Sequence, residues 1–136
     1  MNDVNLESFE DITLAPGTYG TLNFGPSNEV TLTAGSYVFA DIVSDFALNE
    51  LIFDTSAGNI DLYIAADDFV LDDLVQVIDG SSLFGASSPS PQLSNNIFIE
   101  AAGNLTIGSG FFGTFFAPNG DVIIETASNV TGRVFA

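Results

Sequence analysis

The acidic pairs at Asp67-Asp68 and Asp72-Asp73 are the residues of this sequence whose type and spacing most directly suggest chemistry. If the chain turns a corner between the two pairs, several carboxylate oxygens come close together. Ca²⁺ takes about six to eight oxygen ligands in proteins. We therefore predict a weak Ca²⁺ site at Asp67, Asp68, Asp72 and Asp73. The alternative is a solvated acidic edge, because no Asp-x-Asp-x-Asp-Gly calcium loop is present.

Missing residue types exclude most catalytic mechanisms. The chain has no Cys and no His, and Arg133 is its single basic residue, so Lys is absent as well. Zinc clusters, Ser-His-Asp and Cys-His triads, Schiff bases and P-loop lysines each need one of these residues. Asp pairs at the spacing of a glycosidase arise by chance in so acidic a chain. We predict that the protein is not an enzyme and requires no cofactor.

The charge balance restricts the partners. Eighteen acidic residues face one basic residue, which gives a formal net charge of −17. Such a chain repels nucleic acid and anionic lipid, and copies of it approach each other only when salt or divalent ions screen the carboxylates. No apolar run is long enough to cross a membrane, so we expect no membrane insertion. The opening residues lack a signal peptide, so we expect a cytoplasmic chain or one already trimmed.

Internal repeats indicate the architecture. Leu-Ala-Pro-Gly-Thr-Tyr at 14–19 returns as Leu-Thr-Ala-Gly-Ser-Tyr at 32–37, and Phe-Phe-Gly-Thr-Phe-Phe-Ala at 111–117 returns as Val-Thr-Gly-Arg-Val-Phe-Ala at 130–136. A third pair relates 56–62 to 101–107. Between the repeats, apolar and polar residues alternate as in strands. These predicted strands cover 30–32, 60–64, 97–99, 105–107 and 122–124. We interpret 67–78 as two further strands with Asp72-Asp73 at the corner, although a helical stripe is also visible there.

Short strands that recur with the steps of these repeats are typical of a solenoid, in which each coil stacks on the one before. We predict an all-β, single-domain right-handed parallel β-helix of roughly six or seven coils over residues 1–136. Residues 1–10 either cap the first coil or are frayed. Residues 81–94, rich in Ser and Pro, form a loop insertion.

The end of the chain predicts an interaction surface. Strand 114–117 turns at Pro118-Asn119-Gly120, where Asn and Gly accept a positive φ. Strand 131–136 repeats it one coil later, with no cap after it, and an open strand edge is a template for further pairing. Phe residues occur at both parities here, so one set points outward, either covered by another segment or forming a contact patch. The predicted interface comprises Phe112, Phe116, Thr131, Arg133, Val134, Phe135 and Ala136.

A resemblance supports this architecture. The stretches 14–22, 35–39, 113–120 and 131–136 resemble the β-helical domains of bacterial surface and pilus-associated proteins, which include a domain family of unknown function and the related choice-of-anchor adhesive domains. The resemblance implies an exported, extracellular or cell-surface protein, with no catalytic residues to transfer.

Two functions follow as hypotheses. The first is a non-enzymatic structural subunit that stacks end to end into a filament or surface layer, so that its main partner is another copy of itself. The second is an adhesive domain that holds cell-surface carbohydrate or another surface ligand through loop 81–94 or the outward Phe row.

Overall fold

The computed structural model of the chain describes residues 2–44, 49–71, 75–78, 96–107, 111–125 and 130–136. Of these, residues 71, 75–78, 111–112 and 130–132 are described by their backbone alone. All the regular structure in the described residues consists of β-strands, and none of these segments is a helix that could span a membrane.

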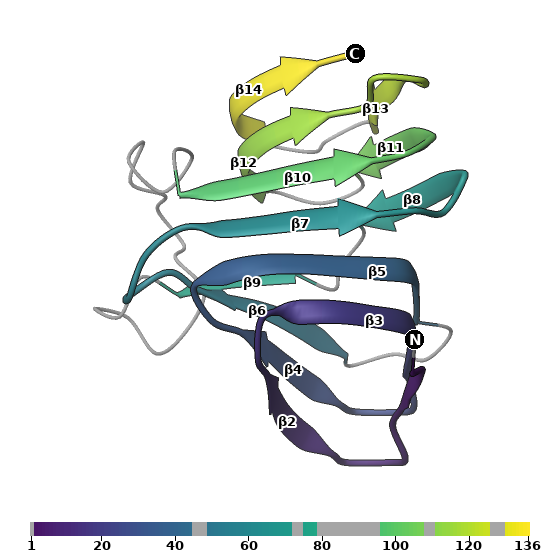
Figure 1. Cartoon of the computed structure of the whole chain (residues 1–136), viewed down its shortest axis with the longest axis vertical. Helices are drawn as coiled ribbons and strands as arrows, with labels where there is room; N and C mark the ends of the chain where they lie inside the picture. Colours follow the sequence, from purple (N-terminus) through teal and green to yellow (C-terminus); the bar gives the residue numbers. More distant parts are fainter. Residues whose placement is uncertain (1, 45–48, 72–74, 79–95, 108–110, 126–129) are drawn as a thin grey trace.

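The strands form three sheets (Figure 1). Sheet A has seven strands, in the order β1 (Val4–Asn5), β3 (Gly17–Phe24), β5 (Gly35–Ser44), β7 (Ile60–Ile64), β10 (Ile97–Ala101), β12 (Phe111–Phe116) and β14 (Val130–Phe135). Sheet B comprises β2 (Asp11–Leu14), β4 (Glu29–Leu32), β6 (Glu50–Asp54) and β9 (Val75–Ile78). Sheet C comprises β8 (Asp68–Leu71), β11 (Asn104–Ile107) and β13 (Val122–Ile124).

Between consecutive strands of sheet A the chain passes through sheet B or sheet C, or, between β7 and β10, through both, and it then pairs with the strand of sheet A that it left. We call the segment from one strand of sheet A to the next a level. All strand pairs in the described residues are parallel. Figure 1 shows the strands of sheet A lying one above another in chain order. The prediction of an all-β chain of stacked parallel strands is confirmed, and the arrangement is compatible with a β-helix or solenoid.

The strand predictions are confirmed where alternation was clear. β7 and β13 have the bounds expected for 60–64 and 122–124. The stretch 67–78 forms the two strands β8 and β9 rather than a helix, and its corner at Asp72-Asp73 lies outside the described residues. The N-terminal segment supplies the first strand of sheet A, since Val4 and Asn5 pair with Leu22 and Asn23. Residues 81–94 lie outside the described part of the chain.

The two copies of the first repeat lie at equivalent corners, but their residues are not paired in one register throughout. Leu14 pairs with Leu32, its counterpart in the repeat, as predicted. Gly17, however, pairs with Tyr37, so the two tyrosines do not stack on each other. Each Tyr hydroxyl instead bonds to a carbonyl of its own corner, and the Tyr37 hydroxyl also bonds to the corner of the level before. Tyr19 donates to the carbonyl of Ala15, and buried Tyr37 donates to the carbonyls of Leu14 (2.8 Å) and Thr33 (3.1 Å).

The other two repeats had opposite outcomes. The repeat at the C-terminus is confirmed, because Phe115 pairs with Val134 and Phe116 pairs with Phe135. The alignment of 56–62 with 101–107 as equivalent coil positions was wrong. The first of these stretches leads into β7 of sheet A and the second into β11 of sheet C. Similar corner residues thus lead into two different sheets, because a Gly-Asn corner serves any bend that precedes an alternating strand.

The expected backbone at Pro118-Asn119-Gly120 was also wrong. The Gly120 N–H donates to the carbonyl of Ala117 (3.3 Å), so a turn is present, but neither Asn119 nor Gly120 has a positive φ. Glycine is required here by close approach between levels. A Cβ on Gly103 would lie 1.8 Å from the carbonyl oxygen of Asp67, and a Cβ on Gly120 would lie 2.6 Å from the backbone of Gly103. The corners of three levels can stack because two of them have no side chain.

The core lies between the sheets and consists of apolar ladders, in which each inward side chain packs on its counterpart in the next level. In sheet B, Leu32 and Phe53 are neighbours and both are fully buried. In sheet A, Leu62 and Ile99 are neighbours with almost no exposed surface. Burial of such side chains contributes about 1.5 to 3 kcal/mol each. The ladders therefore stabilise the fold level by level.

Replacing Gly103 by Ala tests the close stacking of the corners. We expect Gly103→Ala to lower the free energy of unfolding by about 2 to 3 kcal/mol, because the added methyl must push two levels apart. Gly17→Ala is the matched control, since its Cβ would meet no atom closer than 3.9 Å. Urea denaturation followed by circular dichroism measures both variants. Equal stability of the two would contradict the stacking argument.

Candidate assembly interface

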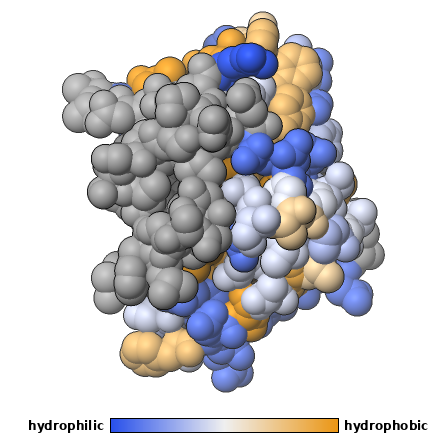
Figure 2. All heavy atoms as spheres, turned by 90° about the vertical axis from the view of Figure 1, so that its left-hand side faces the viewer, coloured by the Kyte–Doolittle hydropathy of each residue, from blue (hydrophilic) through white to orange (hydrophobic). Residues whose placement is uncertain are grey.

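At the C-terminal edge of the molecule, side chains of the last strands are exposed. The paired positions in the preceding level are buried in the core. Val134 on β14 and Ile124 on β13 are 42% and 48% exposed. Their partners in the preceding level, Phe115 and Ile107, are completely buried. The ladders therefore continue to the last strands of sheets A and C and open to solvent there. Figure 2 shows hydrophobic residues at this upper end of the molecule.

Outward-facing apolar side chains add to the same edge. Phe135 is 52% exposed and Ile123 is 46% exposed. Phe116 lies directly beneath Phe135, is half-buried, and packs against Phe98 with ring centroids 6.4 Å apart. The question of which Phe set points outward is thus answered for Phe116 and Phe135, because Phe115 of the opposite parity is buried. We call the exposed surface of Ile123, Ile124, Val134 and Phe135 the C-terminal edge patch.

The remaining predicted interface residues lie on β14, directly after it, or on the neighbouring strand β12. Arg133 is exposed on β14 and pairs with Thr114. Ala136 follows the strand and is also exposed. Phe112 pairs with Thr131 in the backbone register, and their side chains lie outside what the structure describes. The structure therefore brings the predicted interface residues to one edge of sheet A.

The opposite edge of the molecule shows the same opening in a weaker form. Ile12 and Leu14 on β2 are half-buried, whereas their partners Val30 and Leu32 on β4 are fully buried. Val4 on β1 is likewise half-buried against a fully buried Leu22. Both edges thus present apolar ladder positions that lack part of their packing.

The two edges differ in charge. The only basic side chain of the protein, Arg133, lies at the C-terminal edge. The N-terminal edge carries Asp3, Glu7 and Asp11, all of them exposed, and the half-buried Glu10. The C-terminal edge also carries the exposed acids Asp121 and Glu125 on either side of β13, so the attraction between edges is local: Arg133 on β14 can approach the acidic side chains of another copy's N-terminal edge.

The acidic pairs predicted to bind Ca²⁺ are only partly described. Asp67 precedes β8 and Asp68 is its first residue, and both are exposed, whereas Asp72 and Asp73 lie outside the described residues. The Asp68 carboxylate accepts a bond from Nδ2 of Asn104 (2.8 Å), and Oδ1 of Asn104 accepts a bond from the Asp121 N–H (3.0 Å). Within the described part of the chain, no three acidic residues are arranged as metal ligands. The corner shows an asparagine that joins three levels.

An acidic ladder escaped the sequence prediction. Asp11, Glu29 and Glu50 pair in register on β2, β4 and β6. Desolvation, followed by the negative charges of Asp11 and Glu50, raises the pKa of the Glu29 carboxyl. The first repeat could have revealed the pairing of Asp11 with Glu29, because these residues have the same separation in sequence as the two copies of the repeat. Glu50 follows Glu29 at a longer separation, so the repeat does not reveal the second pairing. Like charges directly opposite on paired strands are destabilising.

Comparison with known proteins gives no relative: no family model matches the chain, and neither the curated proteins nor the solved structures include a significant match.

Removing the middle charge of the acidic ladder should stabilise the protein at neutral pH. The raised pKa means that the folded state binds a proton more readily than the unfolded state, so stability falls as pH rises through the range above an ordinary Glu pKa. We expect Glu29→Gln to raise the Tm at pH 7 by about 1 to 3 °C. This gain should vanish as the pH approaches about 4. Thermal scans at several pH values measure it, and a gain that persists in acid would contradict the assignment.

Proposed function

We propose that this protein is a non-enzymatic structural subunit, a right-handed parallel β-solenoid of roughly six or seven coils that self-associates end to end. It acts outside the cell or at the cell surface, in a filament or surface layer. Ca²⁺ and other divalent ions promote association by screening the acidic surface. In addition, Ca²⁺ binds weakly at Asp67, Asp68, Asp72 and Asp73.

The observation that carries the proposal is the opening of the apolar ladders at the C-terminal edge. Val134 and Ile124 continue ladders whose preceding members are completely buried. A further level placed above them would bury these side chains again, and apolar burial is worth about 25 cal/mol per Å². The first level of a second copy offers Val4, Ile12 and Leu14, which are themselves only half-buried.

The geometry of such a contact favours growth. The C-terminal edge of one copy meets the N-terminal edge of the next, so each added copy presents the same free edge again. A head-to-tail contact of this kind produces an open filament unless a rotation closes it into a ring. Backbone donors and acceptors on the outer edge of β14 favour the same contact, because an edge strand is a template for another strand.

Electrostatics set the conditions for assembly. A net charge of −17 opposes association at low ionic strength. At about 150 mM salt the Debye length is about 8 Å, so distant carboxylates are screened while contacts at the edge remain. Arg133 then meets the acidic N-terminal edge of the next copy. Assembly should therefore occur with salt and weaken without it.

A second function, the adhesive domain, is favoured by the outer face of sheet A. There the half-buried rings of Phe98 and Phe116 lie together. An aromatic surface of this kind suits a ligand such as carbohydrate on the flank of the molecule. In this function the flank binds the ligand and the edges serve only for attachment.

Placing a charge in the C-terminal edge patch should block assembly. We expect Phe135→Asp to raise the protein concentration needed for assembly at least about tenfold, because a carboxylate would be buried against apolar side chains. The matched control is Val70→Asp, which changes a residue of similar exposure (50% against 52%) on β8, at the level of the middle strand of sheet A. Sedimentation velocity and negative-stain microscopy at about 150 mM salt with Ca²⁺ measure assembly. Monomeric wild-type protein under all conditions would refute the proposal.

Reversing the charge of Arg133 distinguishes the electrostatic contribution to assembly from the contribution of apolar contacts. We expect Arg133→Glu to slow assembly and to strengthen its dependence on salt, since the edge then repels the acidic N-terminal edge. The rate at about 150 mM salt should fall roughly three- to tenfold, and high salt should restore it in part. Light scattering over time measures the rate. An unchanged rate at about 150 mM salt would show that Arg133 does not lie in the contact.

A further inference from the structure

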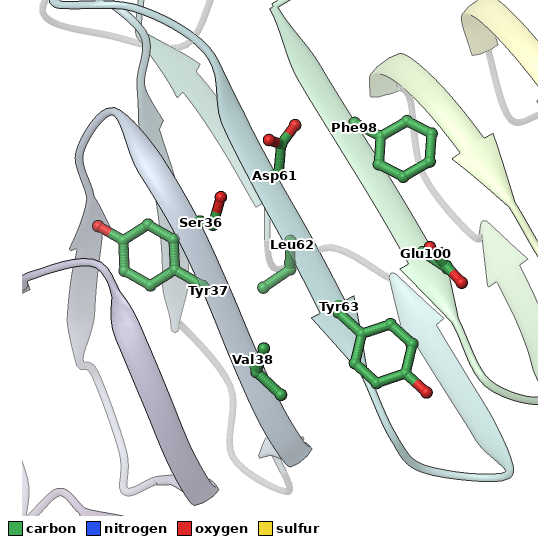
Figure 3. Close-up of a pocket in the computed structure, with 8 residues that line it drawn as sticks. All are labelled: Ser36, Tyr37, Val38, Asp61, Leu62, Tyr63, Phe98 and Glu100. Atoms are coloured by element: carbon green, nitrogen blue, oxygen red, sulfur yellow. The ribbon is translucent and has the colours of Figure 1, made fainter.

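A shallow depression of about 140 Å³ lies on the outer face of sheet A, away from both edges of the molecule. It spans the strands β5, β7 and β10. The outward side chains that line it are Ser36, Val38, Asp61, Tyr63, Phe98 and Glu100, shown in Figure 3. Among the described residues, neither Asp67 and Asp68 nor the C-terminal edge patch lines it.

The register of β7 and β10 arranges four of these residues as a square. Asp61 pairs with Phe98, and Tyr63 pairs with Glu100. Paired strands lie about 4.8 Å apart, and alternate residues of one strand lie about 7 Å apart on the same face. The two carboxylates therefore occupy one diagonal of the square and the two aromatic rings occupy the other. A group above its centre can contact all four side chains.

The square is held in place by its neighbours. Phe98 packs against the ring of Phe116 on β12, which supports it from the side away from the depression. Tyr63, Phe98 and Glu100 are half-buried, while Asp61 is exposed. Because both rings are attached to the hydrogen-bonded centre of a seven-stranded sheet, little conformational entropy is lost when a ligand binds.

The lining selects a cation. No basic side chain lines the depression, and the single Arg of the protein lies on β14, two strands beyond β10. Aromatic faces attract organic cations, and carboxylates form charge-assisted hydrogen bonds with ammonium groups. An anionic ligand would be repelled by Asp61, Glu100 and the net charge of −17.

We propose that this depression binds an alkylammonium group, with Asp61 and Glu100 as the counter-charges and Tyr63 and Phe98 as the cation–π partners. The group belongs either to a small amine or to a lysine side chain of another protein. It does not come from a second copy's side chains, because this chain contains no Lys. The site goes beyond the proposed assembly function and does not depend on it.

The test is a titration of isotope-labelled protein, followed through the backbone amide shifts of β7 and β10 at constant ionic strength. The probes are choline, its neutral isostere 3,3-dimethylbutan-1-ol, Nα-acetyl-lysine amide and glucose. We expect saturable shifts with choline, with a Kd on the order of 10 mM. The neutral isostere should bind at least about fivefold more weakly.

Variants assign the contacts. Asp61→Asn, Glu100→Gln and Tyr63→Leu should each weaken choline binding about two- to fivefold. Glu125→Gln is the control, because it removes one exposed charge outside the depression and should leave the Kd unchanged. An equal loss in Glu125→Gln would mean that only the overall charge attracts the ligand and would overturn the site.

The remaining outcomes are equally decisive. Tighter binding of choline than of the lysine derivative supports the site and indicates a small quaternary amine, and the reverse supports it and indicates a lysine side chain. Equal binding of choline and its neutral isostere overturns the proposal, as does glucose binding tighter than choline. The Phe135→Asp variant should bind choline normally, so failure of this site and failure of end-to-end assembly are distinguishable.

Discussion

Parallel backbone pairing is the constraint on which the rest of this structure depends. Each strand of sheet A hydrogen-bonds to the strand of the next level, and the pairing holds residues directly above one another at the spacing of a β-sheet. Whatever occupies a position in one level must therefore tolerate its counterpart in the next. Apolar positions stack into the core ladders, Gly103 and Gly120 let the corners approach, and the carboxylates of Asp11, Glu29 and Glu50 stack despite their repulsion.

Buried polar groups obey the same constraint. Asn28 is completely buried, and its N–H donates to Oδ1 of Asn49 in the next level at 2.7 Å. Its side-chain amide donates to the backbone of Glu7 in the level before. Half-buried Asn104 likewise joins neighbouring levels at the corner of sheet C, although its hydrogen bonds are exposed. A buried polar group is costly unless it is hydrogen-bonded, and at these corners the donors of Asn28 and Asn104 find their partners in neighbouring levels, which ties the levels together; the buried Oδ1 of Asn28 has no partner among the described residues.

The proposed functions use different parts of one stack. The proposed assembly would use the edges, where the apolar ladders are exposed to solvent, and the proposed ammonium binding would use the flank, where strands are paired on both sides. Because the depression faces away from the axis along which levels are added, assembly would leave it accessible in every copy. A filament would then carry a regular array of weak sites. Such an array binds a ligand with several ammonium groups far more tightly than one site does.

The sequence by itself determined the all-β class, the parallel stacking and the ladder of Phe115 with Val134, because alternation and corner residues act over a few neighbouring positions. It also predicted that one parity set of the Phe residues points outward, and the structure decided that this set includes Phe116 and Phe135. Only the tertiary structure decided which sheet each corner leads into, as with 56–62 and 101–107, and which distant residues meet. The acidic ladder and the square of Asp61, Tyr63, Phe98 and Glu100 depend on register between levels of unequal length, since Asp61 and its partner Phe98 are separated by the whole of β8, β9 and residues 79–95. Local sequence patterns do not show how many residues each level contains. Only the backbone pairing between levels brings these residues together.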